Sequence, residues 1–152
     1  MTNYTEDNMI TKYLQFLQEG GLQAYDVQNV VNDEWTDISD SLTEYCYKRV
    51  AIKRKKKNKS RFPINAEEKE SFYTCRIDIL KKSWQYFKNW VKSNKKKICN
   101  DFAKSYSNQV PKDKTFKKCV NIFDKDVREI NKHLQRDIKS FQIKVEKARK
   151  GI

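Results

Sequence analysis

Glycine and proline are scarce, with only three and two among 152 residues. Sandwiches and barrels need many turns built on these residues, and a phosphate-binding loop needs clustered glycines, so these folds and sites are excluded. The longest apolar runs, such as 50–52, are far shorter than the roughly 20 residues that cross a bilayer. The first twenty residues hold three acids and no apolar stretch. We therefore expect a soluble chain with neither a signal peptide nor a transmembrane segment.

Histidine and closely spaced cysteines are also lacking. The only histidine is His133, and Cys46, Cys75, Cys99 and Cys119 lie 29, 24 and 20 residues apart, without a CxxC pair. A structural zinc site lacks its usual ligand spacing, and a Ser-His-Asp or Cys-His catalyst would need the fold to bring a Ser or Cys to His133. We expect His133 at the surface or the core rim, and four buried thiols, with a disulfide between two of them as the alternative. The sequence thus predicts no enzyme, no metal and no cofactor.

Helical periodicity dominates what is present. Hydrophobic residues make up 38% of the chain, and many recur at alternating steps of three and four, which is the spacing of one face of a helix. The pattern predicts helices near 6–19, 26–55, 66–106 and 113–149. We expect a single all-α domain over residues 1–152: an elongated bundle of three long helices plus a short N-terminal helix, with a basic loop at 53–61.

The same pattern predicts the helix starts and the core. Asp26, Asn65 and Asp113 are the expected N-caps, and Asn65 with Glu68 resembles a capping box. The predicted central core combines residues from the three long helices: Trp35, Ile38, Leu42, Ile79, Phe123, Val127, Ile130 and Leu134.

Charge is unevenly distributed along the chain. Residues 1–47 hold nine acids and one base, whereas residues 48–61 hold nine bases and no acid, and the whole chain has a net charge of +13. Such a surface attracts nucleic acid, anionic lipid or an acidic protein segment. Lysine outnumbers arginine 26 to 7. Because base and phosphate recognition favour the planar arginine side chain, this composition weakens the case for nucleic acid but leaves all three kinds of partner open.

Two basic segments are candidate binding sites: the basic run at 53–61 and the lysines around Trp84. Trp84 lies partly off the apolar stripe that we expect to bury Tyr86, Phe87 and Trp90, and lysines flank it. Tryptophan is enriched at interface hot spots, so we interpret Trp84 as an exposed contact for a partner. The alternatives are a solvated loop for the basic run and core packing for Trp84. The candidate residues are Lys53, Arg54, Lys55, Lys56, Lys57, Lys81, Lys82, Trp84 and Lys88.

Four segments together resemble the PHIST (Plasmodium helical interspersed subtelomeric) family: YTEDNMITKYLQFL, DVQNVVNDEW, KKSWQYFKNW and FKKCVNIFDKDVREINKHLQRDIKSF. The resemblance covers most of the chain and places Trp35 and either Trp84 or Trp90 on the tryptophans of the family. The basic loop at 53–61 departs from the family pattern. The resemblance implies an exported, non-enzymatic helical domain in the host red-cell cytoplasm or at the membrane periphery. Its implied partners are acidic cytoplasmic tails of surface adhesins or the membrane skeleton.

We therefore expect a non-enzymatic helical module that binds an acidic protein segment in host-cell remodelling. One alternative is a cytoplasmic or nuclear domain that binds nucleic acid through residues 48–61 and 95–97. Another is a cytoskeletal or homo-oligomeric bundle, which the heptad-like stripe over 116–134 favours.

Overall fold

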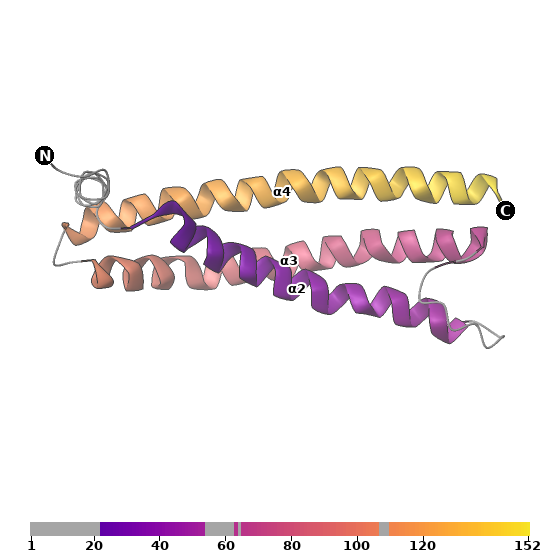
Figure 1. Ribbon diagram of the computed structural model, residues 1–152, viewed down its shortest axis with the longest axis horizontal. Coiled ribbons are helices and arrows are strands. Elements are labelled where there is room, and N and C mark those ends of the chain that lie inside the picture. Colours follow the sequence, from indigo (N-terminus) through magenta and orange to yellow (C-terminus); the bar gives the residue numbers. More distant parts are fainter. Residues whose placement is uncertain (1–21, 54–62, 64, 107–109) are drawn as a thin grey trace, which may run out of the picture. The chain divides into compact units, whose positions relative to one another are not determined.

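The computed structural model describes residues 22–53, 63, 65–106 and 110–152, and nearly all of these are helical. The helices in Figure 1 are α2 (Ala24–Lys53), α3 (Ala66–Ser105) and α4 (Lys112–Lys150). These described ranges contain no strand, so the prediction of an all-α helical bundle is confirmed. The described helix ends agree with the predicted ones to within two residues. The predicted helix at 6–19 and residues 54–61 of the predicted loop lie outside the described residues.

Local hydrogen bonds explain where the helices begin. Asn65 caps α3 as predicted, because its Oδ1 accepts a hydrogen bond from the Glu68 backbone N–H at 2.9 Å. The other two predicted caps are wrong, since Asp26 and Asp113 both lie inside the first turn. The Asp26 carboxylate instead accepts from the Gln23 N–H at 3.1 Å. The Pro111 carbonyl accepts from the Thr115 N–H and so begins the hydrogen-bonding pattern of α4 two residues earlier than Asp113 could.

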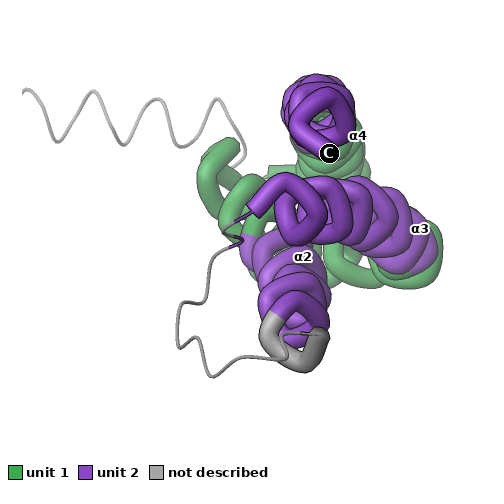
Figure 2. Tube along the Cα trace, turned by 90° about the vertical axis from the view of Figure 1, so that its right-hand side faces the viewer, with its two compact units in different colours: residues 1–32, 90–127 green, residues 33–89, 128–152 purple. Residues whose placement is uncertain are grey.

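The chain divides into two compact units, and each of the three helices contributes to both (Figure 2). Unit 1 takes its described residues from 22–32 and 90–127, and unit 2 takes them from 33–89 and 128–152. Figure 2 shows the change of unit along each helix. Each unit has buried residues of its own, so the two are described separately below.

Unit 1 buries small and aromatic side chains from all three helices. The Trp90 ring of α3 stacks on the Phe123 ring of α4, with centroids 5.9 Å apart. Beside this stack, Lys95 Nζ lies 3.0 Å from Asp124 Oδ1, and Lys118 Nζ donates to the Leu22 carbonyl at 2.7 Å. Phe123 is fully buried as predicted, whereas Val127 is only partly buried. The other buried residues of unit 1 are Leu22, Val27, Val31, Cys99, Ala103, Val110, Thr115, Cys119 and Asp126.

Unit 2 contains two buried clusters. One comprises Cys46, Val50, Phe72, Cys75 and Ile79, and the other comprises Leu80, Leu134 and Ile138. The predicted core residues Ile79, Ile130 and Leu134 are buried, while Trp35, Ile38 and Leu42 are only partly buried. These three lie on α2, where part of each side chain stays accessible to solvent.

A disulfide joins α2 to α3 in unit 2. Cys46 and Cys75 are bonded, with their Cα atoms 5.7 Å apart. The expectation of four thiols is therefore wrong for this pair, and the alternative of one disulfide applies. Cys99 and Cys119 are buried thiols, as predicted. Spacing along the sequence could not distinguish these pairs, because pairing depends on which helix faces meet.

Cations and aromatic rings join α3 to α4 near the C-terminal end of unit 2. Tyr73 and Phe141 stack with centroids 5.7 Å apart. The Arg76 guanidinium lies 5.0 Å from the Phe141 centroid, and Lys144 Nζ lies 5.2 Å from that of Tyr73. Such contacts stabilise by about 0.5–1 kcal/mol each at exposed positions. Arg149 and Glu70 add an ion pair at 2.9 Å.

Candidate protein-binding site

The structure describes only part of the predicted basic site. Residues 54–57 lie outside the described residues, and Lys53 is the final residue of α2. The contribution of this basic run to binding stays a prediction. Lys81, Lys82 and Lys88 are all exposed on the portion of α3 that belongs to unit 2.

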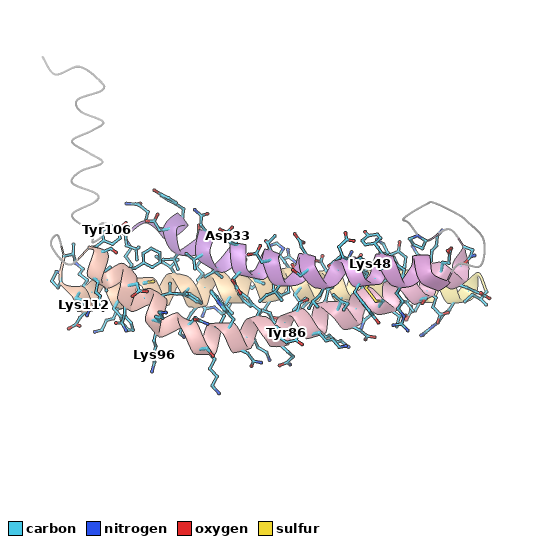
Figure 3. The ribbon with its side chains drawn as sticks, turned by 90° about the horizontal axis from the view of Figure 1, so that it is seen from below. Asp33, Lys48, Tyr86, Lys96, Tyr106 and Lys112 are labelled. Carbon is cyan, nitrogen blue, oxygen red and sulfur yellow. A yellow bond between two sulfur atoms is a disulfide. The ribbon has the colours of Figure 1, made fainter. Side chains whose placement is uncertain are left out.

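These three lysines lie in a stretch without negative charge. Residues 79–100 contain seven lysines and no acid, and the nearest acid before them is the exposed Asp78, one turn before Lys81 and Lys82. Within the described residues, Lys81, Lys82 and Lys88 make no ion pair. Their charges therefore remain available to an anionic partner. The stretch extends into unit 1, where Lys96 is also exposed and its side chain projects from α3 (Figure 3).

Helix geometry places the lysines in two rows that border the exposed side of α3, about 100° or more apart around the helix axis. Lys81 and Lys88 are seven residues apart, which is close to two turns, so they lie on the same side of α3. Lys82 and Tyr86 are four apart and form the second row. We call these four residues the lysine face. Tyr86, labelled on α3 in Figure 3, is 60% exposed, so a large ring lies at the surface one turn from Lys82.

Trp84 is less exposed, and Tyr86 more exposed, than the sequence predicted. Trp84 is only partly exposed, and its ring lies 6.2 Å from that of Trp35 and 5.8 Å from that of Phe87, centroid to centroid. Phe87 is buried as predicted, and Trp90 is partly buried against Phe123. The prediction that Tyr86 lies in the core is wrong. Tyr86 is the exposed aromatic residue of this segment.

A row of acids lies on α2 of the same unit. Asp33, Asp37, Asp40 and Glu44 are all exposed, and their spacing of four, three and four residues places them on one side of the helix. No base occurs between residues 24 and 47. We call this set the acidic row. Sequence reasoning recognised the negative charge of this region but not its concentration on one side of α2. The spacing of four, three and four residues could have indicated that these acids share one side of the helix.

The other chemical groups are those of a packed helical protein. His133 is exposed on α4, in agreement with its predicted surface position. In the part of the chain that the structure describes, no three His, Cys, Asp or Glu side chains come together as a metal site. None of the described helices has an apolar stretch long enough to span a bilayer.

The proposed PHIST resemblance rests on segments whose tryptophans now have defined contacts. Trp35 and Trp84 pack edge to face in unit 2, whereas Trp90 stacks on Phe123 in unit 1. The resemblance itself stays a prediction from the sequence. No protein-family model, no curated protein and no solved structure matches this chain.

Proposed function

We propose that this protein is a non-enzymatic helical interaction module whose lysine face binds an acidic protein segment. The observation that carries the proposal is the exposure of Lys81, Lys82 and Lys88 in a stretch of α3 without acids. The acidic row on α2 supports it, because it repels a negative segment from that side of unit 2 and directs it toward α3.

The expected free-energy contributions indicate that the lysine charges and the Tyr86 ring have different roles in binding. An exposed lysine–carboxylate pair contributes only about 0.2–1 kcal/mol, so three such pairs attract and orient a partner but hold it weakly. Tyr86 offers a large exposed ring, and a buried aromatic residue at an interface can contribute 2 kcal/mol or more. We infer that the bound segment carries an apolar side chain beside its acids, placed to cover Tyr86.

The same observations favour a protein segment over nucleic acid. A duplex presents closely spaced phosphates over a long path, and its binding normally draws on many cations. The lysine face contains no arginine, and arginine is the residue best suited to bidentate contacts with phosphates and bases. Nucleic-acid binding through residues 48–61 and 95–97 remains the second candidate function.

The disulfide bears on the route by which the chain would be exported, because the cytoplasm in which it would act is a reducing compartment. Disulfides form and persist mainly in oxidising compartments, and the Cys46–Cys75 bond accords with passage through the secretory pathway. Together with the PHIST resemblance, this bond leads us to propose an exported protein that remodels the host cell. The proposed acidic segment would belong to an adhesin cytoplasmic tail or to a membrane-skeleton protein.

The first test neutralises the lysine face. Wild type and a Lys81→Gln/Lys82→Gln/Lys88→Gln variant are used to capture proteins from red-cell lysate, and an acidic segment identified in a wild-type partner is then studied by stopped-flow. We expect the variant to associate roughly tenfold more slowly at low salt and to show a weaker salt dependence, because electrostatic attraction mainly accelerates encounter.

A matched control changes three exposed lysines on α4 of the same unit, Lys139, Lys147 and Lys150, to glutamine. This control removes the same net charge but should retain most of the association rate. Equal slowing by both variants would show that only net charge matters, which contradicts the lysine face. Stronger capture of random duplex DNA than of any acidic protein would favour the nucleic-acid alternative. A dimer by light scattering would favour the homo-oligomeric one.

The second test removes the aromatic contact. Tyr86→Ala is expected to accelerate dissociation of the same acidic segment by roughly 30-fold with little change in association, because aromatic contacts set residence time more than encounter rate. Stopped-flow displacement measures the dissociation rate. Circular dichroism checks that the exposed position leaves the fold intact. Dissociation at the wild-type rate would exclude Tyr86 from the interface.

A further inference from the structure

The two cysteines that remain as thiols lie against each other inside unit 1. Cys99 belongs to α3 and Cys119 to α4, and both side chains are fully buried. The pKa of each thiol is shifted first of all by the other, so the two side chains face one another. Unit 1 thus holds a pair of thiols on two different helices, as the bonded pair Cys46–Cys75 is held on two helices of unit 2.

Neighbouring contacts hold α3 against α4 at the level of the thiols. One turn before Cys99, Lys95 Nζ lies 3.0 Å from Asp124 Oδ1, five residues after Cys119. Further along, the rings of Trp90 and Phe123 stack. Both contacts join the same two helices that carry the cysteines. The thiol pair is therefore part of a packed helix interface.

The local electrostatics make the two thiols unequal. A hydrogen bond from Cys119 and, to a smaller extent, the Lys95 ammonium lower the pKa of Cys99, although burial and the Asp124 carboxylate oppose this. The same hydrogen bond, followed by burial, raises the pKa of Cys119. Since the thiolate is the nucleophile in disulfide exchange, this difference favours Cys99 as the first sulfur to react wherever the two thiols are in contact. Before the helices close, either thiol can begin the exchange.

We propose that Cys99 and Cys119 form a second disulfide, which joins α3 to α4 within unit 1. The oxidant is a small disulfide of the glutathione class. The Cys99 thiolate attacks one sulfur of oxidised glutathione and releases one glutathione thiolate, which takes up the proton lost by Cys99. Cys119 then loses its proton and attacks the Cys99 sulfur, releasing the second glutathione. Two protein thiols are oxidised, and one oxidised glutathione is reduced to two glutathione molecules.

Burial determines when this reaction occurs. Neither sulfur is accessible in the folded unit, so glutathione reaches Cys99 before α3 and α4 close during folding, or during a local opening. An environment that forms Cys46–Cys75 also supplies the oxidant for the second pair. The inference is independent of the proposed binding function. It assigns one crosslink to each unit, with α3 as the helix common to both.

Peptide mapping of the wild-type chain tests the proposal directly. The protein is reduced in denaturant, refolded with reduced and oxidised glutathione, treated with N-ethylmaleimide in denaturant, and digested with trypsin at a pH that prevents exchange. Cleavage after lysine and arginine places the four cysteines on different peptides: 13–48, 70–76, 98–104 and 119–125. We expect peptide 98–104 linked to 119–125, together with 13–48 linked to 70–76.

The result that overturns the proposal is equally distinct. It is complete N-ethylmaleimide labelling of peptides 98–104 and 119–125 in molecules whose peptides 13–48 and 70–76 are linked. Linkage of 98–104 to either of the other two peptides would also overturn it. Because the wild-type chain is used, no variant has to fold for this test.

A stability measurement gives a second readout. In a Cys46→Ala/Cys75→Ala variant refolded in the same buffer, a Cys99–Cys119 bond closes a segment with a sequence separation of 20 residues. Its reduction should lower the melting temperature by roughly 6–12 °C, if the crosslink acts through the entropy of the unfolded chain. Adding Cys119→Ala should abolish this sensitivity to reductant. An equal shift in both variants would contradict the proposed bond.

Discussion

Replacing Phe87 by alanine is expected to lower the free energy of unfolding by about 3–5 kcal/mol. Phe87 is fully buried in unit 2, and its ring centroid lies 5.5 Å from that of Trp35 and 5.8 Å from that of Trp84. Truncation removes the transfer free energy of the ring and leaves a cavity beside two indoles, which cannot collapse into it fully. Urea denaturation followed by circular dichroism measures the loss as a lower midpoint at unchanged slope.

The neighbouring residue supplies a matched control for this experiment. Tyr86 has a similar ring on the same helix but is 60% exposed. Tyr86→Ala should therefore change the free energy of unfolding by no more than about 0.5 kcal/mol. A cost for Phe87→Ala below about 1 kcal/mol, or equal costs for the two variants, would contradict the described orientation of this part of α3.

Removing the Cys46–Cys75 disulfide is expected to cost about 3–4 kcal/mol of stability. The bond closes a segment with a sequence separation of 29 residues between α2 and α3, so its loss restores conformational freedom to the unfolded chain. The double variant Cys46→Ala/Cys75→Ala should show this loss in urea denaturation. Removing the two buried sulfur atoms adds a packing cost of its own.

The single variant Cys46→Ala separates the crosslink from packing. If the crosslink dominates, the single and double variants should differ by less than about 1 kcal/mol, because both lack the bond. Near-wild-type stability of Cys46→Ala would show that the bond contributes little. A double variant far less stable than the single one would assign the effect to the buried side chains instead.

The positions of the helices could be predicted because few residues compete with the helical pattern. Apolar residues at steps of three and four extend over 30–40 residues in α3 and α4, with almost no glycine or proline to interrupt them. Asn65 marked the start of α3 because its side chain meets the backbone N–H three residues on. The start of α4 was less well predicted, because Pro111 supplies the first helical acceptor through its backbone carbonyl and not through a side chain.

The orientation of Tyr86 could not be predicted from apolar periodicity. The buried side of α3 passes through Leu80, Ser83 and Phe87. Ser83 is polar, so it leaves a gap in the apolar pattern, and the two adjacent aromatic residues Tyr86 and Phe87 both fit the continuation of that pattern. The structure nevertheless buries Ser83 completely, and its hydroxyl has no hydrogen-bond partner among the described residues. A hydrophobic pattern alone therefore cannot predict that a serine is buried.

The candidate site was predicted in part. Net charge along the chain identified Lys81, Lys82 and Lys88 correctly as surface residues, because long charged side chains are rarely buried. The contact between the aromatic rings of α2 and α3 was not foreseeable, since it depends on how two helices meet in space. This contact partly buries Trp84 and leaves Tyr86 as the exposed ring one turn from Lys82.

The distribution of tryptophan has a consequence for spectroscopy. Trp90 is the tryptophan of unit 1, and Trp35 and Trp84 both belong to unit 2. A Trp35→Phe/Trp84→Phe variant would emit only from unit 1, and a Trp90→Phe variant only from unit 2. Fluorescence transitions that coincide in urea would show that the two units unfold as one, whereas separate transitions would resolve a partly folded state. The chain therefore carries a native optical probe in each unit, and the offset between their midpoints measures the cooperativity of the whole molecule.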